Sequence, residues 1–100
     1  MTGAQRKGER MRMEEAERLA IMALGFIAAE ENRLAQFLHV TGYAPADIRA
    51  EAGSPDFLAG VLDFLLADES QLLVFTSHGD VDPADIAAAS RLLGSSAGGD

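Results

Sequence analysis

One carboxylate stands inside the most apolar stretch of the chain, where an acid could serve in general acid–base chemistry. Asp63 interrupts the run of residues 61–66, which is otherwise made of Val, Leu and Phe. At 100° per residue, however, Asp63 lies nearly opposite the leucine stripe of the expected helix, on a face of small and polar residues. The sequence therefore favours an exposed or helix-capping carboxylate, or a structural ion pair of Asp63 with Arg49 or Arg91.

The two histidines, His39 and His78, are the other side chains that could bind a metal or act as a base. A helical metal site needs a second ligand three or four residues away on the same helix. His39 has none, and Asp82, four residues after His78, lies beyond the end of the helix expected at 69–78. Ser77 directly precedes His78, but adjacent helical side chains point about 100° apart, so the histidine cannot readily activate the serine. The sequence also contains no cysteine, phosphate-binding glycine loop or nucleophile elbow. We expect no catalytic residue, metal ligand or cofactor.

Charge is distributed unevenly along the chain, whose net charge is −8. The first 13 residues carry a net +3, and the remainder carries four arginines against fifteen acids, a net −11. An acidic surface repels phosphate, so we do not expect the folded body to bind nucleic acid. The basic residues near the N-terminus could still contact nucleic acid, an acidic partner or the protein's own acidic body. These residues are Arg6, Lys7, Arg10 and Arg12.

The elements that must position these side chains are all expected to be helices. Alanine and leucine dominate, and no alternating stretch is long enough for a strand. Ser54-Pro55 and Asp82-Pro83 are typical helix starts, and Asp68 with Gln71 resembles a capping box. Gly42, Gly53, Gly79 and Gly94 are expected to end helices. The predicted helices span residues 11–29, 31–41, 45–52, 55–67, 69–78 and 83–93.

These six short helices predict an all-α, compact orthogonal bundle with one domain. The connections are only two to four residues long, so consecutive helices must turn sharply and pack on one another. We assign residues 11–94 to the domain, residues 1–10 to a flexible basic arm and residues 95–100 to a disordered Gly/Ser tail.

Apolar side chains cover more of two helices than one core requires. The helix at 55–67 has a single stripe, formed by Leu58, Val61, Leu62 and Leu65. In contrast, residues 72–75 are apolar in unbroken succession, and the helix at 11–29 carries apolar residues well around its main face. These two helices are therefore either central or shared with a partner.

One stretch of the sequence is specific enough to compare with known families: Val61-Leu62-Asp63-Phe64-Leu65-Leu66 followed by Asp68-Glu69. Further positions that belong to the same pattern are Phe37-Leu38, Thr41-Gly42, Asp47-Ile48-Arg49, Phe57-Leu58, Leu72, Phe75 and Pro83. Together, over about residues 19–94, they resemble an uncharacterised bacterial family, a domain of unknown function. The resemblance implies a compact helical intracellular protein, and it supplies no catalytic residue.

The N-terminal third could be mistaken for an export signal, because basic residues precede the apolar stretch 19–29. Glu14, Glu15 and Glu17 stand directly before that stretch, where signal peptides keep positive charge. No apolar run approaches the 18–20 residues of a membrane helix. We expect a cytoplasmic protein without a membrane contact.

The sequence as a whole favours a non-enzymatic helical module that binds another protein, with a homodimer as one form of that contact. One alternative is a small-ligand-binding or enzymatic protein, with Asp63, Arg49 and a histidine converging between helices. The other is nucleic-acid binding through the basic arm. No sequence feature names the protein partner.

Overall fold

The computed structural model describes residues 11–98, which form six helices and no strand, so the predicted all-α class is confirmed. The basic arm, residues 1–10, lies outside the described residues. The helices are α1 (Met13–Ala28), α2 (Glu31–Thr41), α3 (Pro45–Glu51), α4 (Pro55–Leu66), α5 (Glu69–Gly79) and α6 (Pro83–Gly98).

Capping side chains begin α4, α5 and α6, as the sequence predicts. Ser54 Oγ accepts from the Phe57 backbone N–H at 3.5 Å at the start of α4. At α5, Asp68 accepts from the Gln71 backbone N–H at 3.3 Å and from its side-chain Nε2 at 2.9 Å. At α6, Asp82 accepts from the Ala84 backbone N–H at 2.9 Å. Each cap satisfies a backbone donor that has no partner inside the helix.

The helix ends were predicted less well than the starts. Gly42 ends α2 in the left-handed conformation at φ 83°, as expected. At the end of α5, Asp80 rather than Gly79 adopts that conformation, at φ 56°. Gly94 does not end a helix, since α6 continues to Gly98 instead of stopping at residue 93. A glycine permits a left-handed turn, but it does not require one.

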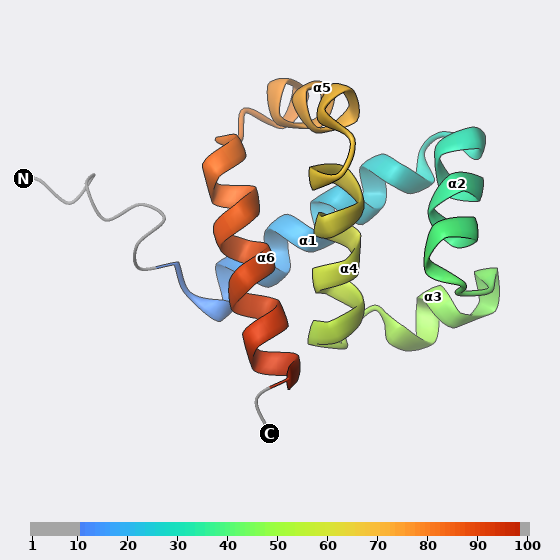
Figure 1. The fold of residues 1–100 in the computed structure, drawn as a ribbon, viewed down its shortest axis with the longest axis horizontal. Coiled ribbons are helices and arrows are strands. Elements are labelled where there is room, and N and C mark those ends of the chain that lie inside the picture. Colours follow the sequence, from blue (N-terminus) through green and yellow to red (C-terminus); the bar gives the residue numbers. More distant parts are fainter. Residues whose placement is uncertain (1–10, 99–100) are drawn as a thin grey trace, which may run out of the picture.

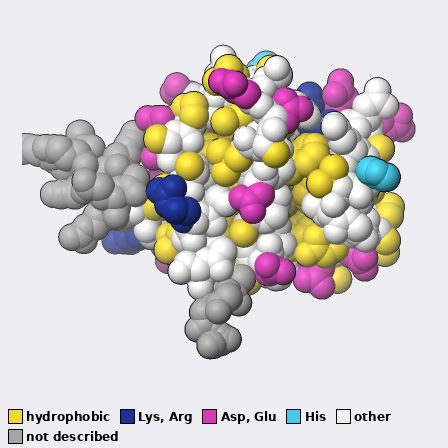
Figure 2. Space-filling view, in the orientation of Figure 1, with side chains coloured by type: hydrophobic (Ala, Val, Ile, Leu, Met, Phe, Trp, Pro, Cys, Tyr) yellow, Lys and Arg dark blue, Asp and Glu magenta, His cyan; other side chains and the backbone are white. Residues whose placement is uncertain are grey.

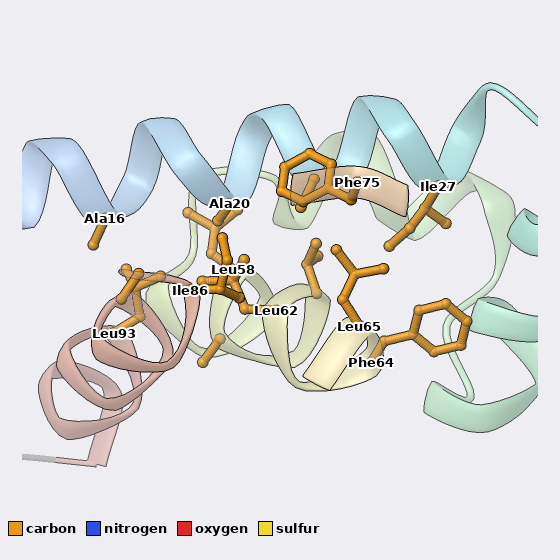
Figure 3. Packing of buried hydrophobic residues seen from close by; sticks show 14 of the residues in the cluster. Ala16, Ala20, Ile27, Leu58, Leu62, Phe64, Leu65, Phe75, Ile86 and Leu93 are labelled. Atoms are coloured by element: carbon orange, nitrogen blue, oxygen red, sulfur yellow. The ribbon is translucent and has the colours of Figure 1, made fainter. Parts of the chain in front are cut away.

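The core lies where α1 crosses the antiparallel pair α4 and α6. Figure 1 shows α4 and α6 side by side with α1 behind them, α5 across one end, and α2 and α3 on the far side of α4. The buried face of α1 has three alanines, which let the crossing helices approach closely: Ala16, Ala20, Ala23 and Ile27. In Figure 3, Ala16 lies beside Leu93 of α6, whereas Ile27 lies near Leu65 of α4.

The predicted phase of α4 is confirmed. All four residues of its apolar stripe are almost fully buried, and Phe57 and Phe64 beside them are buried as well. Phe37 of α2 packs edge-on against both phenylalanines, with ring centroids 6.0 and 5.4 Å apart. These contacts attach α2 to the side of α4 that faces away from α6.

Candidate functional site

A cleft of about 580 Å³ opens between α2, α4 and the first turn of α5. Its apolar lining includes Phe64 and Val40, and the Val40 side chain is 65% exposed. Its polar lining consists of Gln36, Thr41, Asp63, Asp68, Glu69 and Ser70. Figure 2 shows hydrophobic side chains gathered between α4 and α2 on this face, with acidic side chains nearby. We call this hollow the acidic cleft.

Gly60 contributes to the size of the acidic cleft. It lies in the interior of α4 and lines the hollow. A Cβ atom added at Gly60 would meet no other atom within 4 Å, so no neighbouring helix packs against this position. The close helix approach that a glycine permits is therefore not used here.

Replacing Gly60 with alanine is expected to raise the free energy of unfolding by about 0.5–1 kcal/mol. Alanine loses less backbone entropy in a helix interior, and its methyl group would enter open space. Urea denaturation followed by circular dichroism measures the change. The contrasting variant is Gly42→Ala, which must destabilise the protein because Gly42 has φ 83°. Destabilisation by Gly60→Ala would mean that α4 needs the missing side chain.

Asp63 lies on the exposed face of α4, as its helical phase predicts. Its Oδ1 accepts a hydrogen bond from Ser90 Oγ of α6 at 2.5 Å, which links the two helices. Neither Arg49 nor Arg91 forms an ion pair with Asp63, because the only side-chain ion pair within 4 Å between described residues joins Arg33 and Glu30. Arg49 lies on α3, exposed and outside the acidic cleft. Asp63 thus meets a hydroxyl group instead of a guanidinium.

Asp68 and Glu69 place two carboxylates at the start of α5. Gln71 lowers the pKa of Asp68 by donating two hydrogen bonds to its carboxylate. The bond from the Gln71 side chain has the larger effect, and the bond from its backbone N–H has the smaller one. Both bonds favour the charged form, and the helix N-terminus favours a negative charge as well.

Protonation of Asp68 is expected to weaken the start of α5 in acid. A carboxyl group whose pKa is lower in the folded state stabilises the fold above its unfolded pKa of about 4. That stabilisation is lost as the pH falls through the lowered pKa of the folded state. Denaturation of wild type and Asp68→Asn between pH 2 and 7 measures it. The asparagine variant should show a shallower loss of stability below about pH 4, and parallel curves would contradict the assignment.

Arg33 of α2 joins three helices, and nothing in the sequence pattern identified it. Its Nε donates to Gln71 Oε1 at 2.8 Å, and its Nη1 donates to the Phe26 carbonyl oxygen at 2.9 Å. The guanidinium carbon also lies 4.0 Å from the centre of the Phe26 ring. Because Gln71 in turn donates to Asp68, the network ties the end of α1 and the start of α5 to α2. It holds one wall of the acidic cleft.

The structure does not bring the two histidines to the acidic cleft. His39 is exposed on α2, outside the cleft lining. His78 lies near the end of α5, where its Nδ1 is 3.2 Å from the Val74 carbonyl oxygen. Within residues 11–98, no group of three or more His, Asp or Glu side chains is arranged to hold a metal ion. Asp63, Arg49 and a histidine therefore do not form one site.

A second surface is apolar and lies on the outer side of α5. Leu73 and Val74 are 50% and 44% exposed, and they line a shallow hollow together with Val81. Met22 of α1 reaches the same region, since a Cβ at Gly79 would lie 3.5 Å from its Cε and 3.4 Å from Val81 Cγ2. We call Met22, Leu73, Val74 and Val81 the α5 face. The α5 face therefore contains part of the excess of apolar side chains that the sequence predicts for α1 and α5.

Comparison with known protein families places this chain in one of them. Residues 13–96 match the model described as "Protein of unknown function (DUF3572)". The chain belongs to this family. The resemblance of residues 19–94 to an uncharacterised family, a domain of unknown function, is thereby confirmed. No curated protein and no solved structure matched the chain.

The DUF3572 match contains both surfaces and leaves out the basic arm. The acidic cleft and the α5 face lie within residues 13–96, whereas Arg6, Lys7, Arg10 and Arg12 precede them. Arg12 is exposed and directly precedes α1; the other three lie outside the described residues. The family description names no activity, so it assigns no site residue. In the described part of the chain, no helix has both the length and the apolar character needed to span a bilayer.

Proposed function

We propose that this chain is a non-enzymatic protein-binding module and that its α5 face binds a second copy of the chain. The exposure of Leu73 and Val74 on α5 is the observation that carries the proposal. Adjacent exposed apolar side chains on a small protein mark an interaction surface, because burying them against a partner removes apolar area from water. Met22 and Val81 extend the same apolar area beyond α5.

Electrostatics favour a second copy at this face. The hollow beside Leu73 and Val74 is lined by apolar and hydroxyl side chains and by His78, with no carboxylate. Two copies of a chain with net charge −8 repel each other over most of their surfaces. A contact through a carboxylate-free face keeps the acidic groups at the rim, where solvent screens them.

The double variant Leu73→Ser/Val74→Ser tests the proposal. At high salt, where contacts between exposed charges are screened, we expect wild type to sediment as a dimer at high protein concentration and the variant to sediment as a monomer. Both side chains are about half exposed, so serine should leave the fold intact, which circular dichroism checks. The matched control is Val40→Ser, which removes a still more exposed apolar side chain outside the α5 face. A monomeric wild type, or a variant that remains dimeric, would overturn the proposal.

The sequence alternative of an enzyme or small-ligand protein has less support. A volume of about 580 Å³ would admit a small ligand. The acidic cleft nevertheless brings together three carboxylates without the arginine or histidine that the alternative requires.

We also propose a cytoplasmic location. The absence of cysteine is compatible with a reducing compartment, and the glutamates at positions 14, 15 and 17 argue against an export signal. Cell fractionation with an antibody against the native chain tests this, and recovery in an exported fraction would contradict it.

A further inference from the structure

We propose that the acidic cleft receives the basic N-terminal segment, residues 1–10, of a second copy of this chain. The contact uses a different surface from the α5 face. It also gives a role to the basic N-terminus and the acidic remainder of the chain, which the proposed function does not explain.

The lining of the acidic cleft suits a ligand that is both cationic and partly apolar. Asp63, Asp68 and Glu69 supply carboxylates, and none of the Lys, Arg or His residues that the structure describes belongs to the lining. Asp63 is exposed, and within residues 11–98 it accepts a hydrogen bond from the Ser90 hydroxyl group and forms no ion pair. Phe64 and Val40 add apolar surface next to these charges. Arginine and lysine side chains match this combination, because their stems are apolar and their ends are charged.

The N-terminal segment is the part of this chain with the complementary charge. Its three basic side chains are Arg6, Lys7 and Arg10, and Glu9 is its one acid. Across the remaining sequence from residue 14 onward, the acids outnumber the basic residues by fifteen to four. The segment and the cleft therefore attract each other at long range, whereas the rest of the two surfaces repel.

Geometry favours the segment of a second copy over the chain's own. Figure 3 places Phe64, which lines the cleft, at the Ile27 end of α1, whereas the segment joins the opposite end at Met13. The 14 residues from Met13 to Ile27 span about 21 Å of helix. Arg10 is only three residues before Met13 and covers about 10 Å when fully extended. A second copy can present all three cations to the cleft without this limit.

A complementation experiment tests the contact. One variant lacks the cations (Arg6→Gln/Lys7→Gln/Arg10→Gln), and another lacks two cleft carboxylates (Asp63→Asn/Glu69→Gln). Asparagine at position 63 retains an oxygen that can accept from Ser90, so the link to α6 is kept. Both variants also carry Leu73→Ser/Val74→Ser, so that the α5 face cannot hold the copies together. Sedimentation velocity at low salt measures association of each variant and of their equimolar mixture.

Each variant alone should sediment as a monomer, and the mixture should form a 1:1 complex. Only the mixture contains both an intact segment and an intact cleft. The parent Leu73→Ser/Val74→Ser chain should dimerise at low salt and dissociate as salt rises, since exposed charges are screened. Gly60→Leu in that parent should also abolish the contact, because its side chain would enter the cleft without a change of charge.

The matched control is Asp56→Asn/Glu31→Gln, which removes the same charge from exposed positions on α4 and α2 outside the cleft. It should associate like its parent. A monomeric parent at low salt, a mixture that stays monomeric, or equal loss in this control would overturn the proposal. Binding of the cation-bearing variant to an RNA oligomer without self-association would assign the segment to nucleic acid instead. None of these outcomes bears on wild-type dimerisation through the α5 face, which is measured separately at high salt.

Discussion

Replacing Leu62 with alanine is expected to lower the free energy of unfolding by about 2–5 kcal/mol. Leu62 is fully buried on the stripe of α4, at the helix around which α1 and α6 pack. Alanine would lose the transfer free energy of the removed carbons and would leave a cavity in a close-packed interior. A whole domain of this size has a stability of only about 5–15 kcal/mol. Leu62→Ala is therefore the variant closest to unfolding the protein.

Urea denaturation of wild type and Leu62→Ala at neutral pH measures this loss. The matched control is Leu73→Ala, the same substitution at a side chain that is 50% exposed on α5. It should change stability by less than about 1 kcal/mol, because exposed substitutions usually have small effects. A loss below about 1 kcal/mol at Leu62 would contradict the packing of α4.

Replacing Arg33 with alanine is expected to lower the free energy of unfolding by about 2 kcal/mol. The side chain is only 18% exposed, and its hydrogen bonds reach the Phe26 carbonyl oxygen and Gln71. Alanine would leave both acceptors without that donor and would remove the contact with the Phe26 ring. The ion pair with Glu30 adds little, because that carboxylate is largely exposed.

Two further variants distinguish the network from charge alone. Arg33→Lys keeps the charge but cannot reproduce the planar set of donors, so it should recover only part of the lost stability. Arg49→Ala removes an exposed arginine and should cost less than about 0.5 kcal/mol. Equal stability of Arg33→Ala and Arg49→Ala would show that the network contributes nothing.

Local sequence signals predicted most helix starts and fewer helix ends. A serine or aspartate followed by proline, or an aspartate three residues before Gln71, acts through hydrogen bonds and backbone angles within one turn. These effects need no distant contact. The end of α6 differs, because Gly94 permits either outcome and the helix continues past it. The burial of Leu93 just before it shows α6 still packed against the core there.

In the candidate sites too, features that depend on one helix were predicted from the sequence, and contacts between distant residues were not. The exposed face of Asp63 followed from helical phase, and its partner Ser90 did not, because that residue lies 27 positions away on another helix. The ion pair predicted between Asp63 and Arg49 is not formed, because α3 places Arg49 outside the acidic cleft. Arg33 carried no local signal, since Gln71 is 38 residues away. The acidic cleft likewise combines side chains from three helices.

The sequence by itself determined the helical class, the number of helices, the buried stripe of α4 and the excess of apolar side chains on α1 and α5. Each of these depends on the spacing of residue types within one helix, where 3.6 residues per turn relates position to direction. Only the tertiary structure decided which helix ends meet, where the carboxylates gather, and which apolar side chains stay exposed. Those outcomes depend on how the three-alanine face of α1 crosses α4 and α6, and that crossing is set by contacts between distant residues.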